Sequence, residues 1–187
     1  MQGPSADWLN ANRAFYAAQL ADVRGPVLDC ACGTGLFLLP WLDAGHDVFG
    51  FDASAAMLGA LSKKADADVR HRLSVQRLQD FEYDLRLGAV CIPTNTFGML
   101  TTQQDQLRTL TNIRTHLREA GRLLLDLRLP GMDDLAAEKA GVTGRVHSWP
   151  HLETGLPIKQ QISDTRDHVD QLYMNECRIE YEGTVHE

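Results

Sequence analysis

The fold of this chain is decided by the stretch Val27-Leu28-Asp29-Cys30-Ala31-Cys32-Gly33-Thr34-Gly35. Its first half is a short apolar run, which is typical of a buried strand. Its second half is a turn, in which Gly33 and Gly35 let the backbone bend tightly and approach a ligand. Leucines then recur at helical spacing as far as Gly45. The stretch therefore predicts a strand, a tight turn and a helix in succession.

The alternation of strands and helices continues along the chain. A helix is expected over 8–23, Ser54 and Thr102 are expected to cap two later helices, and Gly121 is expected to end the second of these. Pro40 is expected to kink its helix or to stand in the first turn. The expected strands cover 26–30, 47–51, 73–78, 87–92 and 122–129. This order predicts an α/β fold with a doubly wound, mainly parallel sheet.

The pattern changes after Pro130. Helices give way to strand-like runs from about residue 142, most clearly in Leu172 to Tyr181, where two sets of side chains alternate. We therefore expect a C-terminal antiparallel β appendage. The predicted division is a core domain over residues 1–130 and an appendage over residues 131–187 that partly covers the substrate.

Charge and composition limit the kinds of partner that this chain can bind. The chain has 187 residues, a net charge of −7 and a pI of about 5.4, so it lacks the positive field that gathers nucleic acid or an anionic membrane. A small-molecule partner is favoured. The first residues do not read as a signal peptide, which predicts a cytoplasmic protein. The four cysteines are expected to be reduced, and Cys30-x-Cys32 is not a zinc spacing, so no metal is expected.

Two carboxylates specify the expected ligand. Asp52 ends the second strand, 17 residues after Gly35, where a carboxylate can accept both hydroxyls of a ribose. Asp29 immediately precedes the glycine turn, where its charge would repel a pyrophosphate and favour a cationic nucleoside. Leu38 also stands where the dinucleotide fingerprint has its third glycine. S-adenosylmethionine (SAM) is therefore the expected cofactor.

Four segments resemble class I SAM-dependent methyltransferases, and small-molecule methyltransferases in particular. They are Val27 to Gly35, Val48 to Ser54 with Met57-Leu58, Asn95 to Leu100, and Glu119 to Asp126. The resemblance implies SAM-dependent methyl transfer to a small molecule, with the cofactor held beside Asp29. It implies that Ala31, Gly33 and Gly35 bracket the methionine portion of the cofactor and that Asp52 binds its ribose. Ala53 and Met57 would face the adenine, and Asp80 or Phe81 would lie at the adenine edge. Asn95 would also line the cofactor site, and Trp8 and Tyr16 are the candidates for substrate contact.

Several questions stay open from sequence alone. Methyl transfer is an in-line displacement that needs alignment and a dry pocket, so no residue is assigned as catalytic. The alternatives are a SAM-binding or assembly module without turnover, a NAD(P)-dependent oxidoreductase and a nucleic-acid methyltransferase. The last two strands of the family's sheet have no counterpart before residue 187. An uncovered edge strand favours pairing, which predicts a homo-oligomer, most simply a dimer.

Overall fold

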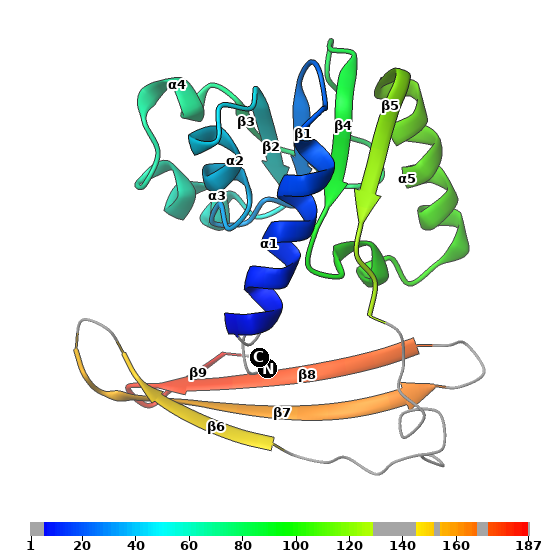
Figure 1. Cartoon of the computed structure of the whole chain (residues 1–187). Coiled ribbons are helices and arrows are strands. Elements are labelled where there is room, and N and C mark those ends of the chain that lie inside the picture. The colour runs from blue at the N-terminus through cyan, green and yellow to red at the C-terminus, as the bar shows by residue number, and fades with distance from the viewer. Residues whose placement is uncertain (1–5, 129–144, 152–153, 168–171, 187) are drawn as a thin grey trace. The chain divides into compact units, whose positions relative to one another are not determined.

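The computed structural model describes residues 6–128, 145–151, 154–167 and 172–186. They belong to two compact units, one formed by residues 6–128 and one that contains 145–186 (Figure 1). No helix within these described ranges is long and apolar enough to cross a membrane.

The larger unit is built on one parallel sheet. Its strands lie in the order β3-β2-β1-β4-β5, and each pairs in parallel with its neighbour. Their bounds are β1 Val27–Cys30, β2 Val48–Asp52, β3 Leu73–Val75, β4 Leu87–Ile92 and β5 Leu117–Leu125. The order reverses between β1 and β4, which places a topological switch point beside the first strand. The predicted doubly wound sheet is confirmed.

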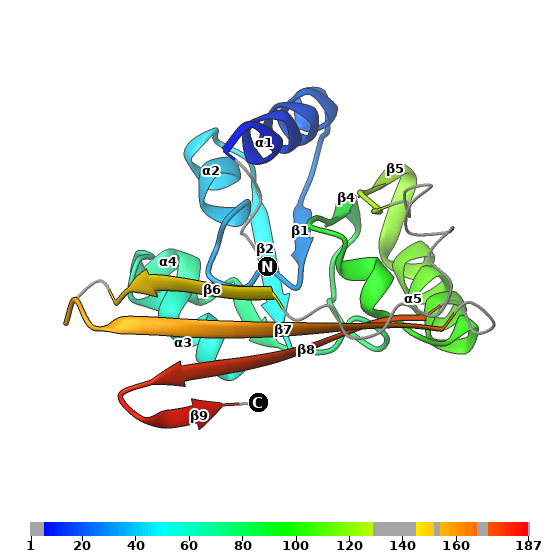
Figure 2. The same cartoon turned by 90° about the horizontal axis from the view of Figure 1, so that it is seen from below.

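Helices cover both faces of this sheet. They are α1 Ala6–Leu20, α2 Leu38–Asp43, α3 Ala55–Ser62, α4 Ala67–Arg70 and α5 Gln103–His116, with a 3-10 turn η1 at Thr96–Met99. Residues of α1, α2 and α3 form one apolar core with Val27, Val48 and Ala89, whereas Ile113 of α5 belongs to a second core with Leu28. Figure 2 shows α1 and α2 on one side of the sheet and α5 on the other.

Local signals in the sequence explain where several helices begin. The hydroxyl of Ser54 accepts a hydrogen bond from the Met57 backbone N–H at 3.3 Å, and that of Thr102 accepts one from Asp105 at 3.1 Å. Both caps are confirmed, and each satisfies a donor of a first helical turn. Pro40 is the third residue of α2, so it stands in the first turn, where its missing N–H breaks no helical bond.

The expectation for Gly121 was wrong. Helix α5 ends at His116, and β5 already begins at Leu117. A Cβ at Gly121 would lie 3.0 Å from the Leu87 carbonyl oxygen on the neighbouring strand. The glycine therefore permits a close approach of β5 to β4, at a point where the strand register shifts, and does not end a helix. The third strand is also shorter than expected, because β3 ends at Val75.

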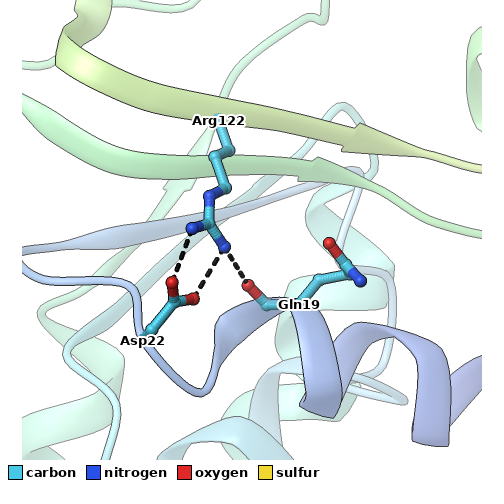
Figure 3. Close-up of polar contacts among 3 residues, drawn as sticks. All are labelled: Gln19, Asp22 and Arg122. Carbon is cyan, nitrogen blue, oxygen red and sulfur yellow. Dashed lines mark hydrogen bonds and ion pairs between the residues drawn. The ribbon is translucent and has the colours of Figure 1, made fainter.

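An arginine fork connects the end of α1 to the edge strand β5 (Figure 3). Arg122 donates to both carboxylate oxygens of Asp22 at 2.7 Å and to the backbone carbonyl of Gln19 at 2.9 Å. The paired donors match the planar carboxylate, and the cation lies at the negative end of the helix. The last turn of α1 is thus fixed to a strand about a hundred residues later in the chain.

The smaller unit is an antiparallel sheet in the order β6-β7-β8-β9. Its strands are β6 Arg145–Pro150, β7 Pro157–Asp167, β8 Leu172–Tyr181 and β9 Thr184–His186. The alternating pattern of Leu172 to Tyr181 therefore belongs to a strand, as predicted, and the appendage is antiparallel.

Candidate functional site

Acidic and polar side chains gather at the carboxyl edge of the parallel sheet. Asp29 lies near the end of β1 and Asp52 is the last residue of β2, while Asn95 follows β4 and Asp126 follows β5. Because neighbouring parallel strands end at the same edge, these residues surround the switch point between β1 and β4. This edge is the candidate site.

The turn after β1 contains three residues in the left-handed region, Ala31, Gly33 and Gly35, with φ values of 55°, 55° and 88°. The two glycines serve different purposes. A Cβ on Gly35 would lie 2.5 Å from Cδ1 of Leu61, so this glycine lets the turn pack against α3. A Cβ on Gly33 would have no atom within 4 Å. The space beside Gly33 is therefore open.

Asp52 joins this turn to the end of β2. One oxygen of its carboxylate accepts the Gly33 N–H at 2.9 Å, and the other accepts the Ser54 N–H at 2.8 Å. A carboxylate oxygen can accept two hydrogen bonds, so each retains one free position. The carboxylate is held in a fixed orientation and can accept two further donors, which suits a pair of adjacent hydroxyls.

Asp29 is only 2% exposed. Burial raises the pKa of its carboxyl to about 8, against the lowering effect of the Leu38 backbone N–H, and nearby Asp52 raises it further. The carboxyl is therefore mainly protonated at neutral pH in the free protein. The sequence argument took this carboxyl as charged, whereas its burial favours the neutral form in the free protein. A cation bound nearby would lower this pKa and restore the negative charge.

The residues expected around the adenine divide into exposed and buried ones. Ala53 and Met57 are exposed at the start of α3, and Asp80 is exposed and forms an ion pair with Arg108 at 3.5 Å. Phe81 is fully buried and stacks on Phe51 with ring centroids 5.1 Å apart. Of the two alternatives for the adenine edge, only Asp80 presents its side chain to solvent.

The edge formed by β4 and β5 has its own hydrogen-bond network, centred on Asp126. The Asp126 carboxylate accepts hydrogen bonds from the Tyr16 hydroxyl at 2.9 Å and from the backbone N–H groups of Thr94 at 2.8 Å and Asn95 at 3.0 Å. No separate role was expected for Asp126, although a carboxylate directly after a buried strand is a signal for this edge.

The turn that Asp126 holds is unusual. Thr94 and Asn95 have φ values of 61° and 60°, a region that residues other than glycine rarely adopt. The side-chain oxygen of Asn95 accepts the Arg128 backbone N–H at 2.9 Å, which leaves its NH₂ group as a donor for other partners. A Cβ at Gly98 would lie 2.8 Å from that oxygen, so any larger residue there would displace the Asn95 amide.

The two substrate candidates on α1 differ in exposure. Trp8 is 40% exposed, but Tyr16 is fully buried. The Tyr16 ring contacts Phe37 and Trp41 of the α2 region, with centroids 5.4 and 5.6 Å away. Burial is the main cause that raises the pKa of the Tyr16 hydroxyl, and the hydrogen bond to Asp126 raises it further. Tyr16 therefore supports the site from within the core and shows no surface to a substrate in this structure.

The cysteines beside the site are buried thiols. Cys30, Cys32 and Cys91 are buried and form no disulfide, and burial raises the pKa of all three. They consequently remain protonated at neutral pH and unreactive. Within the residues that the structure describes, no group of three or more His, Cys, Asp or Glu side chains could hold a metal ion.

Comparisons with known proteins identify relatives of this chain. Residues 27–121 match the family model described as "Methyltransferase domain". The chain is 32% identical over 147 residues to the cypemycin N-terminal methyltransferase of a Streptomyces species, which covers 78% of this chain and 56% of the relative. It is 33% identical over 105 residues to the glycine/sarcosine N-methyltransferase of Aphanothece halophytica, covering 54% of this chain and 40% of that protein. The chain thus spans about half the length of these curated relatives.

Solved structures show the same architecture. The glycopeptide N-methyltransferase MtfA, complexed with SAM, aligns with a TM-score of 0.58 and 27% identity over 88% of this chain and 74% of MtfA. The CcbJ methyltransferase of Streptomyces caelestis aligns with a TM-score of 0.73 and 23% identity, covering 98% of this chain and 71% of CcbJ. At that identity the second likeness concerns the fold alone.

Proposed function

We propose, because the chain belongs to the class I SAM-dependent methyltransferase family, that it binds SAM at the carboxyl edge of β1 and β2 and methylates a small-molecule or peptide acceptor. The observation that carries the proposal is Asp52, whose carboxylate is oriented by two backbone N–H groups beside the open space at Gly33. Family membership decides against the NAD(P)-dependent oxidoreductase that the sequence left open.

The proposed cofactor residues follow the geometry of this edge. Asp52 would accept both ribose hydroxyls with its two remaining acceptor positions. Asp29, buried behind the turn, would become charged beside the cationic methionine portion. The full set is Asp29, Ala31, Gly33, Gly35, Asp52, Ala53, Met57, Asp80 and Asn95, with Phe81 behind it in the core.

Methyl transfer requires the protein mainly to align the cofactor and the acceptor. SAM would supply a methyl group on a positively charged sulfur, which is already activated for displacement. The chain's residues would hold the cofactor at Asp52 and Gly33, place the acceptor near Asn95 and exclude water. No covalent step on a side chain is needed, and no catalytic residue is assigned. Trp8, exposed on α1, is proposed to contact the substrate.

Nitrogen is the acceptor atom that we propose first. The named relatives methylate an N-terminus, glycine or sarcosine, and a glycopeptide nitrogen. Residues 1–130 would form the cofactor domain and residues 131–187 an appendage that partly covers the acceptor.

We also propose a cytoplasmic homodimer. Strand β5 is an edge strand of the parallel sheet, and no strand among the described residues pairs with its outer side, where a second copy would pair. Unpaired cysteines suit a reducing compartment. Light scattering at micromolar concentration should give twice the chain mass; a monomer would contradict the dimer and leave the cofactor site unaffected.

Titration calorimetry tests the main proposal. SAM and its product S-adenosylhomocysteine (SAH) should both bind at one site, and NADH should give no heat. Incubation with methyl-labelled SAM and a panel of amines should then label an acceptor. Binding of NADH, or no heat from SAM, would overturn the proposal. Binding without transfer to any acceptor would favour the module without turnover.

A further inference from the structure

The carboxylate of Asp126 accepts hydrogen bonds from neutral donors only. It is half-buried, and its three donors, the Tyr16 hydroxyl and the Thr94 and Asn95 backbone groups, are all neutral. The ion pairs found in the described part of the chain involve other carboxylates, Asp47, Asp80 and Asp22. Among the described residues no cation is paired with the Asp126 carboxylate, so a cation bound beside it would be stabilised by its charge.

Asp126 also retains room for a ligand. Its Oδ1 accepts two hydrogen bonds, from Tyr16 and Thr94, whereas Oδ2 accepts only the Asn95 N–H. One acceptor position therefore remains on Oδ2. The neighbouring Asn95 amide has its oxygen occupied by Arg128, so its NH₂ group is available as well.

The position of Asp126 in the sheet places this free acceptor away from the cofactor's ribose. Asp52 ends β2, on one side of β1, while Asp126 follows β5, beyond β4 on the other side. Tyr16 connects the two sides, because its hydroxyl reaches Asp126 while its ring packs on Phe37, just after the glycine turn.

We infer that Asp126 positions the Thr94–Asn95 turn and selects an amine acceptor by placing its negative charge, which no cation of the described residues pairs with, on the acceptor side of the transfer point. The inference rests on the proposed function. During transfer the nitrogen lone pair forms the new N–C bond as the C–S bond breaks, and the positive charge moves from sulfur to nitrogen. A fixed anion near that nitrogen favours the charge in its new place.

Two cofactor analogues test this without knowledge of the acceptor. SAH has an uncharged sulfur at the transfer point, whereas sinefungin carries an ammonium group in place of the methyl group and is known in complex with the similar MtfA. Calorimetry should show that wild-type protein prefers sinefungin to SAH. Asp126→Asn should reduce that preference by about threefold to thirtyfold, because one charge pair is lost in a half-buried site, while SAH affinity stays within about threefold.

The matched control is Asp43→Asn, which makes the same chemical change at an exposed residue at the end of α2. It should leave the preference for sinefungin unchanged. A merely structural role for Asp126 would weaken SAH and sinefungin together and keep their ratio, so an unchanged ratio in Asp126→Asn overturns the inference. Failure of the wild type to bind either ligand overturns the proposed function instead.

Tyr16→Phe provides a second test if Asp126→Asn does not fold. This variant keeps the ring packing and the charge of Asp126 but removes one donor from its carboxylate. The anion would then be less neutralised, so the preference for sinefungin should be equal to or greater than that of the wild type. A fall in the preference would overturn the inference.

Discussion

The two halves of the carboxyl edge hold their carboxylates in different ways. Asp52 at the end of β2 is held by donors 2 and 19 residues away, in Ser54 and the glycine turn. Asp126 after β5 is held by donors 31, 32 and 110 residues away. The first half therefore needs only β1, β2 and the turns that follow them, whereas the second exists only when α1, β4 and β5 have assembled. Changes in the first half should affect cofactor binding, and changes in the second should affect acceptor preference.

Gly35→Ala should have the largest effect on the first half. The new Cβ would meet Cδ1 of Leu61 at 2.5 Å, at a residue with φ of 88°. We expect the free energy of unfolding to fall by about 2–4 kcal/mol, through overpacking and backbone strain together. Urea denaturation measures the loss. Gly45→Ala is the control, because its φ is 86° and a Cβ there meets no atom within 4 Å. Equal losses would mean that the contact with Leu61 contributes nothing.

Asp52→Ala should have the next largest effect, on binding. The variant removes both proposed contacts to the ribose and leaves the Gly33 and Ser54 N–H groups without their acceptor. The affinity for SAH should fall by roughly 1.5–3 kcal/mol, or about tenfold to over a hundredfold. Calorimetry measures this, with Asp43→Ala as the control. An affinity as high as that of the wild type would remove Asp52 from the site and end the distinction between the two halves.

The pH dependence of stability should reveal the buried carboxyl of Asp29. Its pKa is about 8 when folded, against 3.8 as the reference value, so the folded state binds the extra proton between these two values. Unfolding free energy should therefore fall as pH rises through this window, by about 1 kcal/mol per pH unit from pH 5 to pH 7. Denaturation curves of wild type and Asp29→Asn at several pH values test this, because the variant should lack this slope. Parallel pH profiles would show that Asp29 is ionised throughout.

The smallest effect is expected at the two helix caps, one beside each half of the edge. Ser54→Ala at α3 and Thr102→Ala at α5 should each reduce the unfolding free energy by about 1 kcal/mol. The helices pack in separate cores, so the double variant should lose the sum of the two. Thermal unfolding measures all three variants. A loss in the double variant that differs clearly from the sum would show that the two halves are coupled.

The same contrast explains which features the sequence could predict. The strand, turn and helix of residues 27–45, and the caps at Ser54 and Thr102, depend on neighbours in the chain, and the structure has them. The partnership of Tyr16 with Asp126 spans 110 residues, so no local pattern indicates it. Gly121 reads locally as a helix end, yet the constraint comes from Leu87 on another strand. The buried position of Phe81 likewise depends on stacking with Phe51.

The arginine fork has a consequence for how α1 can move. Arg122 fixes the Gln19 and Asp22 end of the helix, whereas Tyr16 is attached through one hydroxyl bond and ring packing. If α1 swings aside to admit a ligand, it must pivot about its C-terminal end, and both the Tyr16–Asp126 bond and the bond from Arg13 to the Leu36 carbonyl must open. The displacement of α1 would then be greatest near Trp8, about three helical turns from the pivot. Entry of a ligand would release the Asp126 carboxylate at the moment when the acceptor side becomes accessible.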